Sequence, residues 1–332
     1  MSSVRRQHWT SIPIVMSLGV LASCGSTPPT NQASSPAPSS EAASTIAPSN
    51  VKVVATSTVL CDITQQIAAN TINLTCLLKP GTDPHVYEAS PNDRKAIETA
   101  NLVLYSGYNF ESSLIKLIQS TSNATLKVAI AEAAVPTPQQ FDEDGKTVPD
   151  PHVWHNAQNG VKMIVQVEQN LSKVVPANAA LYAKNAQTLT AQVTRIDGWI
   201  RSSIATIPQA SRTLVTTHDA LGYYAKAYNI PVEGALQGIS TDEKPTANRV
   251  KELVKTIQAT KVPTIFAETA INPQLIETVA KESNVKVSDR ELFADGLGEP
   301  GSEGDTYLKM LTANTKTIVQ GLSGKFTPFV AK

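Results

Sequence analysis

From residue 51 onward, short runs of β-branched and apolar residues alternate with longer amphipathic stretches. This order is typical of parallel β-sheets covered by helices. The candidate strands form two groups, 51–56, 72–78, 102–106 and 127–130 in the first and 213–217, 232–236, 263–267 and 285–287 in the second. Predicted helices between them include 92–99, 156–175, 246–258 and 273–282. The pattern predicts an α/β protein of two lobes, each a parallel β-sheet covered by helices.

A longer helical pattern separates the two groups of strands. Apolar residues recur there at steps of three and four, which places them in one stripe on a helix. They are Leu189, Val193, Ile196, Ile200, Ile204 and Ile207. Pro176 suits a helical first turn and Pro208 a stop, so about thirty residues would form a strut of roughly 45 Å. The alternative is two shorter helices broken near Gly198, because an interior glycine costs about 1 kcal/mol relative to alanine.

These elements predict where the chain divides. We expect a first lobe at residues 51–175, a linking helix at 176–208 and a second lobe at 209–332. A folded part of this length suits two lobes better than one.

The first fifty residues are expected to contain an export signal and a flexible tether. Arg5 and Arg6 precede a short apolar stretch at 12–22, and small residues then lead to Cys24, an ending that resembles a bacterial lipobox. We expect residues 1–23 to be a lipoprotein signal peptide and Cys24 to carry lipid; an ordinary signal peptide with an incidental cysteine is the alternative. Residues 24–50 are rich in proline and serine and predict a disordered tether. The protein is expected to be exported and anchored to a membrane, facing the periplasm or the cell exterior.

Composition narrows the function classes. The chain of 332 residues carries 28 basic and 28 acidic side chains, and removal of the leader with Arg5 and Arg6 leaves 26 basic ones. No basic patch predicts binding to nucleic acid. Cys61 and Cys76 can pair in an oxidising compartment, but both lie in apolar-rich stretches that suit buried free thiols equally well. The sequence leaves this pairing open.

Histidine is scarce, with five residues in the chain. The tripeptide Asp-Pro-His occurs twice and ends at His85 and His152; its proline stiffens the turn, so each ring leaves in a preset direction. His218 directly follows the predicted strand at 213–217. Ligands of parallel α/β sheets bind beyond the carboxyl ends of the strands, and histidine is the commonest metal ligand. These three histidines are therefore candidate metal ligands.

Three further residues are expected at or near the predicted metal site. Asp295 lies in the loop after the last predicted strand, so each lobe would supply two ligands to a cleft between them. His155 directly precedes Asn156, a candidate helix cap, and is expected to close its loop without binding metal. Glu268 follows a predicted strand and is a possible acceptor that orients a ligand ring.

Five ordered motifs carry a resemblance to a known family. They are Gly81-Thr-Asp-Pro-His85-Val-Tyr-Glu88, Asp150-Pro-His152-Val-Trp154, Thr217-His218-Asp-Ala-Leu-Gly-Tyr-Tyr224, Gly234-Ala-Leu-Gln-Gly-Ile-Ser-Thr241 and Leu292-Phe-Ala-Asp295. From about residue 51 onward the chain resembles the cluster A-I (cluster 9) metal receptors, lipoproteins that bind zinc or manganese for ABC importers. The resemblance implies a permease and its ATPase as partners, and a long connecting helix that limits lobe motion. It also implies four metal ligands, His85, His152, His218 and Asp295.

The expected cargo is Zn²⁺ or Mn²⁺. Three imidazoles and one carboxylate suit tetrahedral Zn²⁺, and a bidentate carboxylate would let the same set bind Mn²⁺ at a higher coordination number. Manganese-specific members of the resembling family often place glutamate where His218 stands, which favours zinc here. Many zinc-specific members carry a histidine-rich loop, however, and the matching loop at 131–149 has no histidine. The two indications oppose each other, and the choice stays open.

We expect a monomeric receptor that captures the ion and delivers it without chemistry. One alternative is an exported zinc metallohydrolase, since three histidines with an open position also form catalytic sites. The sequence has no His-Glu-x-x-His pair and no Gly-x-Ser-x-Gly motif, and a fourth protein ligand would occupy the place of a reactive water. A surface adhesin, a role described for some relatives, is the other alternative.

Overall fold

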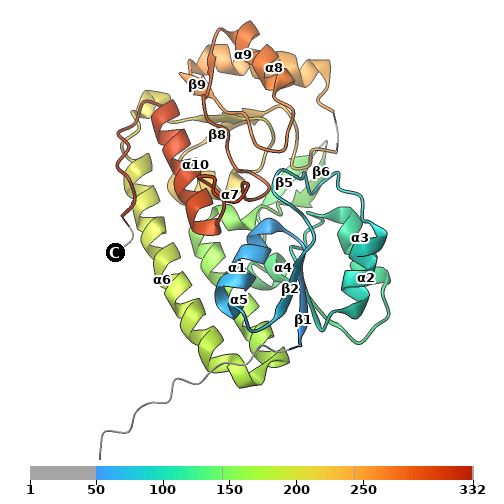
Figure 1. Ribbon diagram of the computed structural model, residues 1–332. Helices are drawn as coiled ribbons and strands as arrows, with labels where there is room; N and C mark the ends of the chain where they lie inside the picture. The colour runs from blue at the N-terminus through green and yellow to red at the C-terminus, as the bar shows by residue number, and fades with distance from the viewer. Residues whose placement is uncertain (1–49, 144, 243, 331–332) are drawn as a thin grey trace, which may run out of the picture. The chain divides into compact units, whose positions relative to one another are not determined.

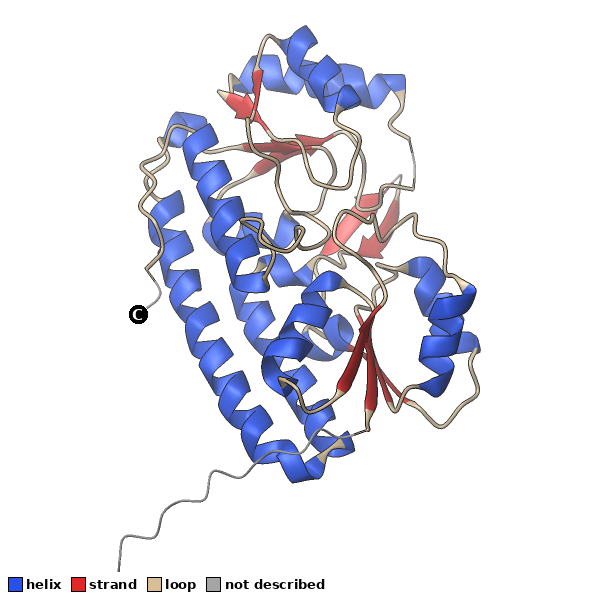
Figure 2. Ribbon diagram, in the orientation of Figure 1, coloured by secondary structure: helices blue, strands red, loops and turns tan. Residues whose placement is uncertain are grey.

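The first lobe is built around a four-stranded parallel sheet, drawn in red in Figure 2. In the computed structural model, which describes residues 50–143, 145–242 and 244–330, the strand order is β2-β1-β3-β4. The strands are β1 Lys52–Ala55, β2 Asn73–Cys76, β3 Leu102–Tyr105 and β4 Leu126–Ala129. The central strands β1 and β3 are almost wholly buried, as a continuous apolar run predicts for a parallel sheet covered on both faces. All four strands predicted for this lobe are present.

Helices cover both faces of this sheet. They are α1 Thr58–Ala68, α2 Pro91–Thr99, α3 Ser112–Ser120, α4 Ile130–Ala134 and α5 Ala157–Val174. Val53 packs with the core that α1 and α5 build, whereas Val54 packs with the core of α2 and α3. Figure 1 shows α1 and α5 on one side of these strands and α2 and α3 on the other. Side chains cap two of these helices at their first turns: Ser90 and Asp93 form a capping box on α2, and Asn156 caps α5, satisfying backbone N–H groups that lack a partner.

The predicted strut is one helix, α6 Ala179–Ile204, preceded by a 3-10 turn at Pro176–Asn178. Its 26 residues span about 39 Å. The helix is continuous through Gly198, so the alternative of two helices is wrong. A Cβ at Gly198 would meet nothing within 4 Å, so the glycine faces away from the packing surface. The opposite stripe is buried against α1, α5 and the last helix (Figure 1), and this burial outweighs the cost of one glycine.

The second lobe is less regular than predicted. Its strands β7 Leu214–Thr216, β8 Val232–Ala235, β9 Thr264–Ile265 and β10 Lys286–Val287 form two parallel pairs, β7–β8 and β9–β10. The Phe266 N–H donates to the Val215 carbonyl at 2.9 Å, which joins the pairs. The strands of the second pair have two residues each, too few for a four-stranded ladder. The helices are α7 Gly222–Tyr228, α8 Ala247–Thr260, α9 Gln274–Ser283 and α10 Tyr307–Gly321.

Two features were not predicted or were left open by the sequence. Residues 131–149, taken as part of a polar loop, contain an antiparallel hairpin of β5 Gln140–Glu143 and β6 Lys146–Pro149. Cys61 of α1 and Cys76 of β2 form a disulfide with a Cα–Cα distance of 5.7 Å, within the usual range. This bond ties the first helix to the edge of the sheet.

The described residues all belong to one compact unit, and the exact lobe boundaries at residues 175 and 208 stay predictions. The expected signal peptide, the lipidation site Cys24 and nearly all of the tether lie outside the described residues. Among the helices of the described part, none is both long and apolar enough to cross a membrane.

Candidate metal centre

The two Asp-Pro-His turns hold their histidines in the same way. Each aspartate accepts the backbone N–H of the histidine two residues later, His85 to Asp83 at 3.0 Å and His152 to Asp150 at 2.9 Å. Asp150 also lies 2.9 Å from Nδ1 of His152, which leaves Nε2 of that ring as the free donor atom. The stiffness predicted from proline is therefore completed by an aspartate side chain that closes the turn.

His218 follows β7, and Glu268 holds it in place. One oxygen of Glu268 accepts the backbone N–H groups of Thr217 at 2.9 Å and His218 at 3.1 Å, and the other contacts Nδ1 of His218. Both side chains are buried. From its place after a predicted strand, Glu268 was a possible acceptor for a ligand ring, and this contact is of that kind. A carboxylate at Nδ1 orients the ring and presents Nε2 to a ligand.

Asp295 reaches the centre on a loop that residues of the first lobe hold on both sides. His155 Nε2 donates to the carbonyl of Ala294 at 2.7 Å, and Thr58 Oγ1 accepts the N–H of Leu297 at 2.8 Å. Burial lowers the pKa of His155 to about 3, so its ring is neutral near pH 7. His155 lies outside the group of four converging residues, and that it binds no metal stays a prediction. Its contact beside Asp295 was not predicted from the sequence, because no local pattern pairs positions so far apart.

The four predicted ligands converge on one point. Oδ1 of Asp295 lies 3.1 Å from Nε2 of His152, 3.3 Å from Nε2 of His218 and 3.6 Å from Nε2 of His85. The Nε2 atoms of His85 and His152 are 3.4 Å apart. One donor atom from each of the four residues lies within 4.8 Å of the others, and all four residues are buried. Segments more than two hundred positions apart in the sequence thus meet in one group.

Several buried polar atoms of this group have no hydrogen-bond partner among the described residues. They are Nε2 of His218 and both carboxylate oxygens of Asp295, although Oδ1 lies at ion-pair distance from the three rings. Buried polar atoms are normally paired, so donor atoms left free and aimed at a common point fit a bound cation. Phe110 packs edge-on against the rings of His85 and His152, with centroids 5.1 and 5.6 Å away. Phe110 carries no motif signal and was not predicted from the sequence.

The charges in the centre shift pKa values in opposite directions. Burial alone would lower the pKa of His218, but the carboxylates of Asp295 and Glu268 raise it well above 6.5. Burial likewise opposes a rise at His152, whose pKa is nevertheless raised by its carboxylate neighbours. Burial would raise the pKa of Asp295, but the histidine rings hold it well below its usual value. The shifted pKa values favour an ionised carboxylate at Asp295 and protonated rings at His152 and His218, so a cation binding here competes with protons for these two rings.

Comparison with known families places the whole folded part in one family. The sequence profile described as "ZnuA: Zinc-uptake complex component A periplasmic" matches residues 53–321. This chain belongs to the ZnuA family. The resemblance to metal receptors of ABC importers, drawn from the five motifs, is confirmed by this match.

Individual relatives agree with the assignment of this chain to the ZnuA family. It is 34% identical over 282 residues to the metal ABC transporter substrate-binding lipoprotein ScbA of Streptococcus cristatus, covering 83% of this chain and 90% of that protein. It is 34% identical over 276 residues to the manganese-binding lipoprotein MntA of Bacillus subtilis, covering 82% and 90%. The solved structure of the periplasmic zinc binding protein TroA from Treponema pallidum is similar with a TM-score of 0.78 and 31% identity, covering 82% and 99%. This likeness confirms the predicted two-lobed α/β fold.

Proposed function

We propose that this chain is the extracytoplasmic substrate-binding protein of an ABC importer, which captures Zn²⁺ or Mn²⁺ between its lobes and delivers it to a membrane permease. The proposed ligands are His85, His152, His218 and Asp295. One observation carries the proposal: four buried donor atoms, one from each residue, lie within 4.8 Å of one another.

The spacing of the donor atoms suits a small four-coordinate ion. A tetrahedral zinc ion with bonds of about 2.0 Å separates its donor atoms by about 3.3 Å. The separations between Asp295 and the three rings are 3.1, 3.3 and 3.6 Å, and that between His85 and His152 is 3.4 Å. These four separations match a tetrahedral zinc site, and all donor atoms of the set lie within 4.8 Å of one another.

Mn²⁺ fits the same residues when Asp295 binds it through two oxygens instead of one. Its second oxygen has no hydrogen-bond partner among the described residues, so the carboxylate can bind through both oxygens and raise the coordination number as Mn²⁺ prefers. The names of the relatives point both ways, since MntA is called manganese-binding and TroA zinc binding. We therefore assign the cargo to the pair Zn²⁺ and Mn²⁺.

The partners follow from the role of a substrate-binding protein. A permease in the membrane takes the ion, and an ATPase drives the transport cycle. We infer that the chain works as a monomer outside the cytoplasm, in the periplasm or at the cell exterior, and that lipid on Cys24 holds it at the membrane. Relatives that are named lipoproteins support the lipid anchor and the location outside the cytoplasm.

The same geometry argues for binding without chemistry. A catalytic zinc site keeps a position open for a reactive water, whereas here a fourth side-chain donor, Asp295, completes the tetrahedron of the three histidines. No observation on the described residues favours the adhesin alternative.

Elemental analysis tests the proposal. Full-length protein purified without a metal-affinity tag is expected to contain about one equivalent of zinc or manganese. Competition titration between Zn²⁺ and Mn²⁺ on the stripped protein then identifies the preferred ion. Protein that contains neither metal, and whose melting temperature neither metal raises, would overturn the proposal.

A further inference from the structure

Asp295 comes from the last part of the chain but is attached to the first lobe. On one side of it, His155 donates to the Ala294 carbonyl at 2.7 Å; on the other, Thr58 accepts from the Leu297 N–H at 2.8 Å. His155 precedes α5 and Thr58 opens α1, both helices of the first lobe. The two hydrogen bonds bracket Asp295 within three residues of chain.

The helix that follows this loop is attached to the same part of the molecule. The backbone N–H of Tyr307, at the start of α10, donates to Asp62 of α1 at 2.8 Å, and the Tyr307 hydroxyl donates to the carbonyl of Trp154 at 2.7 Å. Tyr307 also packs so closely on α5 that a Cβ at Gly160 would lie 2.0 Å from its hydroxyl. The start of α10 is therefore fitted to α1 and α5.

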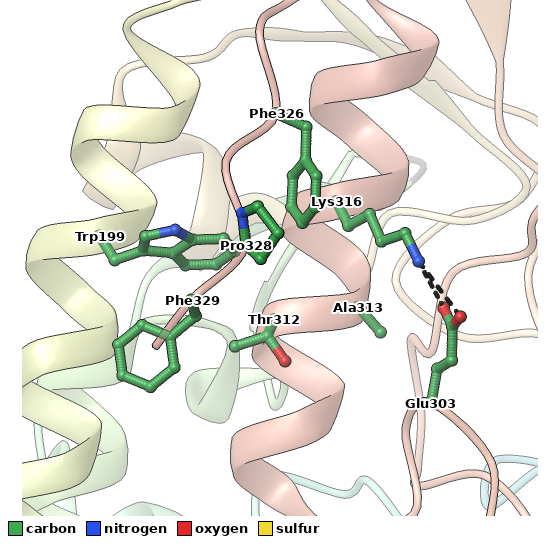
Figure 3. Close-up of a pocket in the computed structure, with 8 residues that line it drawn as sticks. All are labelled: Trp199, Glu303, Thr312, Ala313, Lys316, Phe326, Pro328 and Phe329. Carbon is green, nitrogen blue, oxygen red and sulfur yellow. Dashed lines mark hydrogen bonds and ion pairs between the residues drawn. The ribbon is translucent and has the colours of Figure 1, made fainter. Parts of the chain in front are cut away.

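The far end of α10 is fastened to the linking helix. The chain after α10 turns back along α6, where the indole N–H of Trp199 donates to the Thr327 carbonyl at 2.9 Å. Figure 3 shows Phe326, Pro328 and Phe329 of this tail beside Trp199, with α10 behind them. Because α6 itself packs against α1 and α5, α10 and its tail belong to the body that carries the first lobe.

His218 stands on a different body. A separate small core holds the two strand pairs of the second lobe together with α8 and α9; its buried residues are Val215, Leu236, Leu253, Ile257, Val262, Ile265, Ala267, Ile276, Val279 and Ala280. His218 follows β7 of this body, and its backbone and ring are both held by Glu268, three residues after β9. The main core contains Leu292, Leu297 and the apolar residues of α10 together with residues of the first lobe; Leu214 of β7, Leu221 and Phe266 also reach it, so the small-core body meets the main core along β7.

The chain crosses between the two bodies just before Asp295. Leu292 still exchanges backbone hydrogen bonds with Ala267 and Thr269 of the small-core body. The next residue, Phe293, is bonded through its N–H and its carbonyl to the side chain of Asn314 on α10. The change of attachment therefore falls between residues 292 and 293, and Asp295 lies on the side of the first lobe.

We propose that His85, His152 and Asp295 form a three-ligand half-site on one body, that Thr58 and His155 are positioning residues for Asp295, and that the cation is released when the small-core body withdraws His218. This inference rests on the proposed function. It replaces the even division predicted from sequence, two ligands from each lobe, with three and one. The half-site keeps the carboxylate and two rings assembled while the fourth donor arrives or leaves.

Distance measurements test which ligands move together. A ketone-bearing amino acid that accepts a spin label, introduced in pairs at the exposed positions Lys95 of α2, Lys309 of α10 and Lys251 of α8, leaves the Cys61–Cys76 disulfide untouched. Addition of Zn²⁺ to stripped full-length protein is expected to change the Lys95–Lys251 distance and to leave the Lys95–Lys309 distance unchanged. In His218→Ala protein, Zn²⁺ is expected to leave both distances unchanged.

Two outcomes would overturn the inference. One is a Lys95–Lys309 distance that changes in step with Lys95–Lys251, because Asp295 would then travel with His218. The other is a zinc-bound wild-type protein in which neither distance responds. Zinc binding itself is measured separately by calorimetry on the wild type, so a failure of the proposed function is distinguished from a failure of the three-and-one division.

A matched pair of threonine variants tests the positioning role. Thr58→Val removes the hydroxyl that accepts the Leu297 N–H, whereas Thr64→Val makes the same change in the same helix at a buried hydroxyl with no partner among the described residues. Thr58→Val is expected to weaken Zn²⁺ binding about tenfold and to alter the visible spectrum of the Co²⁺-loaded protein. Thr58→Ser should restore both, and Thr64→Val should match the wild type. Equal affinities and spectra for Thr58→Val and Thr64→Val would refute the role of Thr58.

Discussion

Replacing Glu268 with glutamine tests how much the acceptor behind His218 contributes to metal binding. Glu268 is buried and accepts two backbone N–H groups with one oxygen while the other contacts Nδ1 of His218. Glutamine keeps the shape and one acceptor oxygen. If that oxygen stays on the backbone, an NH₂ group faces Nδ1. The ring must then accept at Nδ1 and carry its proton on Nε2, the atom required for the metal.

The size of the effect follows from the loss of this orientation. Removing a partner that orients a metal-binding histidine costs about 10- to 100-fold in affinity, or roughly 1.4 to 2.7 kcal/mol. Metal at a thousand times the dissociation constant stabilises the wild-type fold by about 4 kcal/mol. At the same metal concentration the variant should retain about 1.4 to 2.7 kcal/mol of this stabilisation. With roughly 2 °C per kcal/mol for a protein of this size, a wild-type shift of about 8 °C falls to about 3 to 5 °C.

Differential scanning fluorimetry with and without Zn²⁺, supported by chelator competition, measures this change. Glu277→Gln on the exposed face of α9 is the matched control, and it should behave as the wild type. The deficit of Glu268→Gln should be larger at pH 8 than at pH 6, because losing the carboxylate also lowers the raised pKa of His218 and so weakens proton competition at low pH. Wild-type zinc affinity in Glu268→Gln at pH 8 would refute the reasoning.

Three further predictions follow from other contacts. The zinc-induced rise in melting temperature should grow from pH 6 to pH 8. The raised pKa of His218 stabilises the metal-free fold below pH 6.5, and this stabilisation is lost as pH rises through the folded-state pKa, while competition between protons and metal also declines. A rise in melting temperature that does not depend on pH would contradict this. Thr241→Val breaks the hydrogen bond from Thr241 to Asp83, 2.6 Å long and joining the small-core body to the His85 turn, and should speed zinc release to a chelator about tenfold, whereas Thr278→Val on the exposed side of α9 should leave the rate unchanged. Replacing Cys61 and Cys76 together with serine opens a disulfide that spans 15 residues and should lower the free energy of unfolding of the metal-free protein by about 3 kcal/mol in urea titration; an unchanged midpoint would show that the bond does not restrain the unfolded chain.

The helices and the ligands were predictable because their signals are local. Asn156 and Thr246 stand before apolar periodic stretches and cap α5 and α8, so each helix begins where the sequence indicates. The two Asp-Pro-His turns and the histidine after β7 mark strand ends, and parallel strands bring their carboxyl ends to one edge. The four predicted residues do converge, which local periodicity and the topology rule together anticipate.

The hairpin and the irregular second sheet were not predictable in the same way. Strands β5 and β6 are polar and short, without the apolar alternation that identifies a strand. In the second lobe the apolar runs at 263–267 and 285–287 were recognised, but only two residues of each pair in a ladder. Ladder length depends on how neighbouring backbones align, and composition does not record that alignment.

The sequence by itself determined the fold class, the linking helix and the identity of the four converging residues, because periodicity, caps and strand ends are properties of neighbours along the chain. Only the tertiary structure decided that α6 stays continuous at Gly198, that Glu268 faces Nδ1 of His218, and that Asp295 is tied to the first lobe through Thr58 and His155. These facts depend on packing between segments as much as 239 residues apart. Such packing depends on the shape and the hydrogen bonds of the whole core, and each local stretch of sequence contains only one of the two surfaces that pack together.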